Sequence, residues 1–159
     1  MRKYLKWGLA LVFVCWCVFI WHFSLASGEA SAETSKGVVD FCNDVLQNVG
    51  VKTEVSTHAV RKTAHFSEFF VLGVLAASAL LAHGFHHWLF LSPAPVLAVA
   101  AIDECIQIFA PNRGPHVLDV LLDFVGGICG IALFYLIFLL VSFIINKRKE
   151  KNKEISKNS

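Results

Sequence analysis

The stretch FVGGICGIALFYLIFLLVSFII, residues 124–145, contains no charged side chain and decides the fold class. About 20 apolar residues in a helix cross the roughly 30 Å hydrocarbon layer of a bilayer, and this stretch is long enough to do so. A second run without Lys, Arg, Asp or Glu extends from Leu9 to Phe23. The two runs predict a membrane-spanning helix near each end of the chain.

Two more apolar segments lie between these runs, from about Thr63 to Ala82 and from about Trp88 to Phe109. The whole chain of 159 residues is 56% hydrophobic and 16% charged, with a mean hydropathy of +0.61. That composition is too apolar for one soluble core. We therefore predict an all-α fold, a four-helix transmembrane bundle.

Basic residues are concentrated at the two ends of the chain, which indicates the orientation. Three precede the first span, and six follow the last: Arg2, Lys3 and Lys6, then Lys147, Arg148, Lys149, Lys151, Lys153 and Lys157. The region between the first two spans is acidic, with Glu29, Glu33, Asp40, Asp44 and Glu54 against Lys36 and Lys52. Both termini are therefore expected in the cytoplasm, with the acidic loop exported.

The exported loop contains apolar residues at helical spacing between Val38 and Val49, with Gly50 as a stop. This pattern predicts a short amphipathic helix that either lies on the outer membrane surface or caps the bundle. The expected organisation is transmembrane helix 1 at 1–26, the exported loop at 27–57, a core with helices 2–4 at 58–146, and a basic cytoplasmic tail at 147–159. We expect that tail to be disordered and solvated.

The first span also has the features of a cleavable signal peptide, because a basic start and an apolar run precede Ala30-Ser31-Ala32. However, the apolar run reaches Phe23, which is long for a signal, and the Ala-x-Ala motif lies well beyond its end. An uncleaved anchor is the better interpretation.

Polar side chains on the second span share one helical face. If this helix begins near His58, then Arg61, His65 and Glu68 follow at spacings of three or four residues. At 1.5 Å per residue, Glu68 lies about 15 Å below the outer end. Even low estimates make a lone ionised carboxylate at a helix centre unfavourable by about 2.5–3.5 kcal/mol. We therefore expect such groups to face partners or a watery cavity.

The third and fourth spans bring further polar groups to the same depth. Ser92 and Pro93 suit the N-cap and first residue of a helix that runs outward, and the fourth helix opens with Asp119 and Asp123 one turn apart. A polar binding site in the outer half of the bundle is the result. Its predicted residues are Arg61, Lys62, His65, Glu68, Asp103, Glu104, Gln107, Arg113, Asp119 and Asp123.

The residue types leave the chemistry of this site open. Carboxylates with His65 could hold a divalent metal, but no HExxH or CxxC spacing supports one, so no metal and no cofactor are predicted. Ser67 faces another side of its helix, which disfavours a Ser/His nucleophile. Burial could prepare a carboxyl for general acid/base work. The catalytic candidates are Glu68, Asp103, Glu104 and His65.

Basic residues near the outer interface offer a simpler use for the site. Arg61, Lys62 and Arg113 could receive a phosphate or carboxylate. We therefore expect an anionic headgroup as ligand and membrane lipids as neighbours, and no nucleic acid. Gly126 and Gly130 have the small-xxx-small spacing that lets helices approach closely, on a neighbouring helix or in a homodimer.

Two motif-rich stretches, VRKTAHFSEFFVLGVL at 60–75 and AIDECIQIFAPNRGPHVLDVLLDFVGGICG at 101–130, resemble the VanZ-like family of bacterial membrane proteins. The resemblance rests on Arg-Lys before Ala-His-Phe-x-Glu, on Asp-Glu-x-x-Gln-x-Phe, on Pro-x-Arg and on Gly-x-x-x-Gly. The resemblance is dense over the second to fourth spans, whereas the first span is similar only in its general character. The motif residues are Arg61, Lys62, His65, Glu68, Asp103, Glu104, Gln107, Arg113, Asp119 and Gly126, and Asp123 stands where many relatives have Asn.

The resemblance implies a multi-pass protein of the bacterial cytoplasmic membrane that acts in the cell envelope. The family is named for a member that gives low-level antibiotic resistance to the glycopeptide teicoplanin, so an effect on glycopeptide susceptibility is one expectation. Two hypotheses remain open. The protein binds the headgroup of an envelope lipid or cell-wall precursor, or it is an enzyme that modifies such a headgroup.

Overall fold

The computed structural model describes residues 2–25, 28–48, 55–109 and 117–157. They form helices and no strand, which confirms the all-α prediction. The helices are α1 (Arg2–Ser24), α2 (Gly28–Asn48), α3 (Thr57–Ala82), α4 (Trp88–Leu91), α5 (Pro93–Gln107) and α6 (Val117–Lys157). Four segments are long and apolar enough to cross a membrane, as predicted: Tyr4–Ser24, Thr57–Ala82, Trp88–Gln107 and Val117–Lys153.

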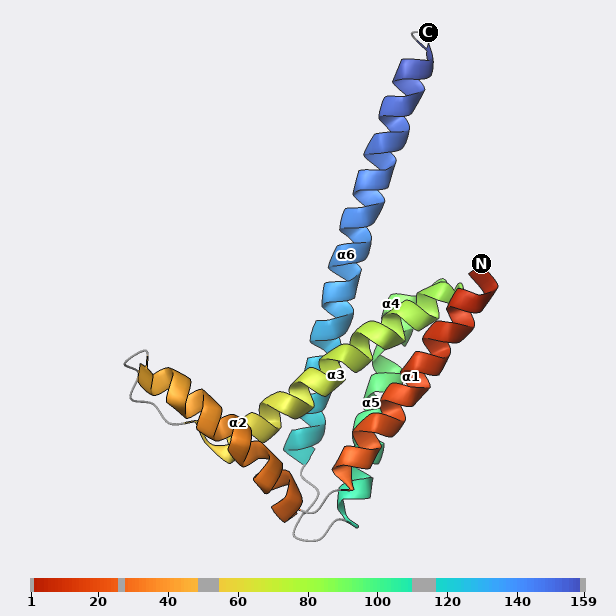
Figure 1. Ribbon diagram of the computed structural model, residues 1–159. Helices are drawn as coiled ribbons and strands as arrows, with labels where there is room; N and C mark the ends of the chain where they lie inside the picture. The colour runs from red at the N-terminus through yellow and green to blue at the C-terminus, as the bar shows by residue number, and fades with distance from the viewer. Residues whose placement is uncertain (1, 26–27, 49–54, 110–116, 158–159) are drawn as a thin grey trace.

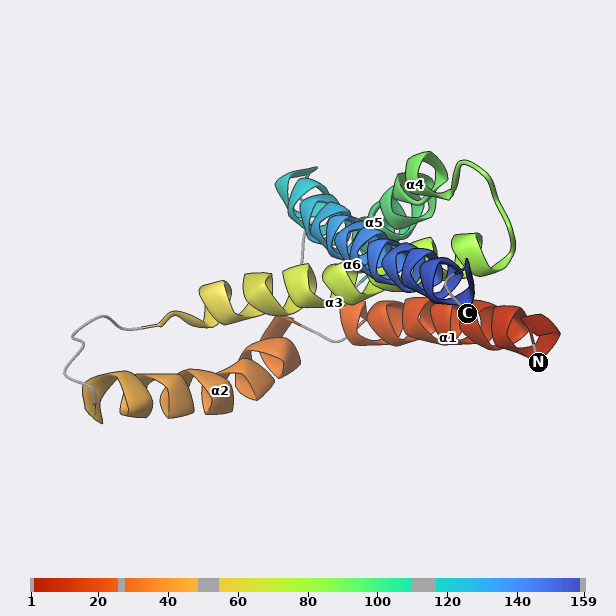
Figure 2. The same cartoon turned by 90° about the horizontal axis from the view of Figure 1, so that it is seen from above.

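The bundle is organised around α3, which contacts α1, α2, α4, α5 and α6. Helix α6 crosses α3, and α1 runs alongside α3 and α5 (Figures 1 and 2). Both chain termini lie toward one end of the bundle, whereas the starts of α3 and α6 and the end of α5 lie at the other (Figure 1). The polar ends of three spans are thereby brought to the same end, away from the termini.

Hydrogen bonds at the helix ends follow from local sequence. Helix α3 is capped by Ser56, whose hydroxyl oxygen accepts a bond of 3.2 Å from the amide of Ala59. Pro93 is the first residue of α5, as predicted. Ser92 occupies the N-cap position, but its hydroxyl donates to the carbonyl of Trp88 at 2.5 Å instead of capping. The third span therefore consists of the short α4 and then α5.

Glycines hold α6 directly against α3. A methyl group built on Gly126 would lie 2.6 Å from the carbonyl oxygen of Phe66, and one on Gly130 would collide with the carbonyl of Phe70. From the other helix, a methyl group on Gly73 would collide with the α6 backbone. Small residues allow this approach where lipid supplies no hydrophobic drive. The predicted close packing at Gly126 and Gly130 is confirmed, and the homodimer stays a prediction.

Helix α1 joins the bundle through apolar packing and one hydrogen bond. Ile20 is fully buried in the same cluster as Phe69, Leu72 and Val96. The indole N–H of Trp16 donates to the carbonyl oxygen of Glu68 at 3.0 Å. The first span is therefore attached to α3 at the level of the predicted site.

The predicted amphipathic helix is present as α2. It is longer than expected, because α2 begins at Gly28, and part of its apolar face, including Phe41, is exposed. The basic tail was expected to be disordered, yet α6 continues through it to Lys157. Lys, Arg and Glu are good helix formers, and a helix already nucleated in the span propagates without a new nucleus.

Candidate functional site

A small polar cavity of about 30 Å³ lies between α3, α5 and α6, at the end of the bundle away from the termini. Because α3 runs in the opposite direction to α5, the first turns of one helix meet the last turns of the other. Seven predicted site residues line the cavity: Arg61, Lys62, His65, Glu104, Gln107, Asp119 and Asp123. The structure thus brings residues from three separate spans to one place.

Charged groups are deepest on the α5 and α6 sides of the cavity. Asp103 has an exposed fraction of 0%, Asp123 of 1% and Glu104 of 5%. By contrast, Lys62 and Asp119 are only partly buried and pair with each other, with 3.3 Å between Nζ and Oδ1. The ion pair thus occupies the accessible side of the site, and the buried carboxyl groups lie beneath it.

Gln107 orients one of the buried carboxyl groups. Its side-chain amide donates to Oδ2 of Asp103 at 2.9 Å, one helical turn away on α5. Both residues are buried, so this hydrogen bond is shielded from competing water. The bond thus fixes the orientation of the Asp103 carboxyl group within the site.

Asp123 is the most unusual residue of the site. Neither of its carboxylate oxygens has a hydrogen-bond partner among the described residues, although the side chain is almost fully buried. Buried polar groups are hydrogen-bonded in the great majority of cases, and leaving a charged one unsatisfied is costly. Nε of Arg61, which also lines the cavity, likewise has no partner in the described part of the chain. Both groups are available to a ligand.

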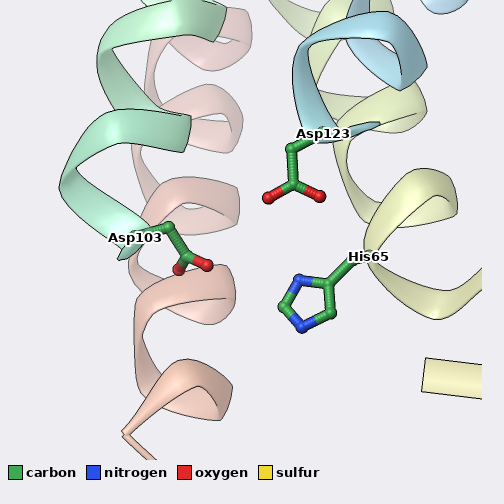
Figure 3. A group of neighbouring side chains, drawn as sticks. All are labelled: His65, Asp103 and Asp123. Atoms are coloured by element: carbon green, nitrogen blue, oxygen red, sulfur yellow. The ribbon is translucent and has the colours of Figure 1, made fainter. Parts of the chain in front are cut away.

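Three possible metal ligands converge from three helices. One ligand atom from each of His65, Asp103 and Asp123 lies within 4.8 Å of the other two. Figure 3 shows the two carboxylates and the imidazole directed toward a common centre between α3, α5 and α6. No short sequence motif marks this triad, because each ligand comes from a different helix.

Among the predicted site residues that the structure describes, one belongs neither to the cavity lining nor to the triad. Glu68 does not line the cavity, and its backbone carbonyl is the acceptor for Trp16. Arg113 lies outside the described residues. His58, which sequence reasoning used only as a helix boundary, does line the cavity. Its spacing of three residues from Arg61, on the same helical face, is the signal that could have identified it.

A family model described as VanZ/LLP1 matches residues 9–142. The match begins in α1, ends in α6 and includes every residue that lines the cavity. No curated protein and no solved structure matches the chain.

Proposed function

This chain belongs to the VanZ/LLP1 family, and on that premise we propose that its polar cavity binds the anionic headgroup of an envelope lipid or a lipid-linked cell-wall precursor. Arg61 carries the proposal, because its guanidinium lines the cavity with a buried Nε that has no hydrogen-bond partner among the described residues. A planar guanidinium matches the oxygen pairs of phosphate and carboxylate groups. Lys62 already pairs with Asp119, so Arg61 is the cation that we assign to the ligand.

The size of the cavity limits what can enter. A volume of about 30 Å³ holds one or two water-sized groups, whereas sites for whole small molecules are typically about 300–1,000 Å³. Only the oxygens of a charged group therefore fit inside, and the rest of the molecule must stay outside. A membrane lipid meets this condition, because its acyl chains stay in the bilayer while its headgroup reaches the cavity.

We further propose that the protein resides in the bacterial cytoplasmic membrane with both termini in the cytoplasm, so that the cavity opens to the outer leaflet. The basic ends of the chain support this orientation. Because the cavity lies at the end of the bundle away from the termini, it would then face outward. Reporter fusions after Ile145 and within residues 29–54 test it. An exported C-terminus would refute it.

Lipid retention tests the headgroup proposal. The full chain is purified in mild detergent, mixed with phosphatidylglycerol or phosphatidylcholine, and the bound lipid is counted by native mass spectrometry. We expect phosphatidylglycerol to be retained preferentially and Arg61→Gln to lose about tenfold or more in affinity, as for a charge-assisted hydrogen bond. Arg148→Gln removes the same charge at the exposed end of α6 and serves as the matched control. Equal retention by both variants would contradict the proposal.

A second candidate function, an enzyme that modifies the headgroup, is favoured by Glu104, which is 5% exposed and lines the cavity beside His65. A carboxyl group at that depth could transfer a proton to a bound headgroup. Glu104→Gln should then abolish turnover while lipid retention persists. Lipid analysis of cells with and without the protein would show a changed headgroup. If the ligand were a glycopeptide target, teicoplanin susceptibility would change with it.

A further inference from the structure

The site contains a donor set of a kind that proteins use for divalent metals. His65, Asp103 and Asp123 each offer one atom, and these atoms lie within 4.8 Å of one another. Nitrogen and oxygen ligands bind such ions at about 2.0–2.2 Å, which places two ligands of one ion about 3–4 Å apart. To bind one ion, the three side chains would therefore move slightly closer together, toward the common centre in Figure 3.

Asp123 provides a second, independent observation in favour of a cation at this position. Its carboxylate points into the cluster (Figure 3), is 1% exposed, and has both oxygens without a hydrogen-bond partner among the described residues. An ionised carboxylate in such a place is strongly unfavourable unless it is paired or coordinates a metal. A metal ion between Asp123 and Asp103 would compensate both charges at once.

The surroundings of Asp103 also fit a ligand. Carboxylates that coordinate metals are usually hydrogen-bonded by a neighbouring group that fixes their orientation. Gln107 has this arrangement, with its amide 2.9 Å from Oδ2 of Asp103. The amide can donate to a carboxylate whether or not the ion is bound, so it holds the ligand in place beforehand.

We propose that His65, Asp103 and Asp123 bind one divalent ion of the Mn²⁺ or Zn²⁺ type, with a coordination position open to the polar cavity. One imidazole with two carboxylates suits ions of intermediate hardness, and not the thiolate-seeking ones. Three protein ligands leave a position for water or for an oxygen of another molecule. His65 and Asp123 line the cavity, so that position faces the cavity. This inference does not depend on the binding of a lipid.

A direct ion pair between Arg61 and Asp123 is the competing explanation, since both side chains line the cavity. Rotation of the guanidinium would satisfy Asp123 without any metal. The two explanations differ in their response to chelation. If Asp123 pairs with Arg61, chelators should not change the stability of the protein. If the site binds a metal, chelators should lower it.

Metal titration of the full chain in detergent tests the proposal. After treatment with EDTA and its removal, MnCl₂ or ZnCl₂ is added, the bound metal is counted by mass spectrometry, and the unfolding temperature is measured. We expect one ion per chain and a rise in unfolding temperature with metal concentration. Asp123→Asn and His65→Gln should each weaken binding at least tenfold, and Gln107→Leu by about 10- to 100-fold. Asp40→Asn and His86→Gln, both at exposed positions, make the same chemical changes and should bind as wild type.

Folding of the variants is checked in EDTA. Asp123→Asn removes an unpartnered buried carboxylate, so its unfolding temperature in EDTA should equal or exceed that of the wild type, and lost metal binding cannot then be ascribed to misfolding. Binding by Asp123→Asn as tight as by Asp40→Asn would overturn the proposal. So would the absence of Mn²⁺ and Zn²⁺ binding, combined with a lowered unfolding temperature for Arg61→Gln in EDTA.

Discussion

Two cavities at opposite ends of α3 differ in size and in chemistry. The polar cavity near the start of α3 measures about 30 Å³, whereas an apolar cavity near its end measures about 290 Å³ and lies between α1, α3 and the start of α5. The larger one is lined by Ala10, Phe13, Val14, Ala76, Ala79, Leu80, His83, Phe85 and Pro95. Lipid chains can fill such a space, because they are as apolar as its walls.

The two cavities also differ in how the titratable residues that line them are hydrogen-bonded. His83 lines the large cavity, but its Nδ1 lies 2.9 Å from the carbonyl oxygen of Ala79, so its own helix satisfies it. Asp123 in the small cavity has no such local partner among the described residues. Among the described residues, buried polar atoms without a partner mark the candidate site, and the volume of a cavity does not.

The largest effect that we expect comes from a change beside the polar cavity. Gly126→Ala places a methyl group 2.6 Å from the carbonyl oxygen of Phe66, so two backbones must separate. We expect the free energy of unfolding in detergent to fall by about 1–3 kcal/mol. Gly126→Leu should lower it further. Because Gly126 lies one turn from Asp123, metal binding should weaken too.

Gly8→Ala is the matched control for this substitution. A methyl group at Gly8, on α1, meets nothing within 4 Å, so its effect should be neutral or stabilising by up to about 1 kcal/mol. Equal stability of the Gly8 and Gly126 variants would show that the contact between α3 and α6 is not tight.

A smaller effect is expected between the two cavities, where α1 is attached to α3. Trp16→Phe removes the hydrogen bond to the carbonyl oxygen of Glu68, which should lower the free energy of unfolding by about 1 kcal/mol. Metal stoichiometry should not change, because Trp16 does not line the polar cavity. Trp7→Phe, at a side chain that is 61% exposed, should change the free energy of unfolding by no more than about 0.5 kcal/mol. A loss of metal binding in Trp16→Phe would mean that α1 positions the site.

The smallest effect is expected in the apolar cavity itself. Ala79→Val adds methyl groups to a space of about 290 Å³. The free energy of unfolding should therefore change by no more than about 0.5 kcal/mol. Ala77→Val makes the same change at a fully buried core position and should cost about 1–3 kcal/mol. If Ala79→Val were the more harmful of the two, a bound lipid chain that fills the cavity would be the first explanation to examine.

Much of the architecture could be predicted because one-dimensional patterns determine it. Long apolar runs located four spans, and Pro93 located the start of α5. The spacing of Gly126 and Gly130 indicated a close helix contact. The convergence of polar residues from three spans could also be predicted, since depth in the membrane follows from distance along each helix.

The internal arrangement of the site could not be predicted, because it depends on how each helix is rotated about its axis. Asp103 and Glu104 are adjacent in sequence and point in directions about 100° apart, yet both are buried. Sequence gave no reason to separate Glu68, which does not line the cavity, from His65, which does. The triad with Asp123 requires the rotation of three helices to be known together.

The contact between Gly126 and the carbonyl of Phe66 joins two backbones, and a backbone contact has no rotamers. Side-chain packing can adjust by rotamer changes. A contact between two backbones cannot adjust in this way, so the helices either stay in contact or move apart. Phe66 follows His65 directly, and Gly126 follows Asp123 by three residues. The backbone contact therefore fixes the distance between the Cα atoms of His65 and Asp123. The entropy of bringing them together is therefore lost when the bundle folds, and a ligand that arrives later finds them already placed.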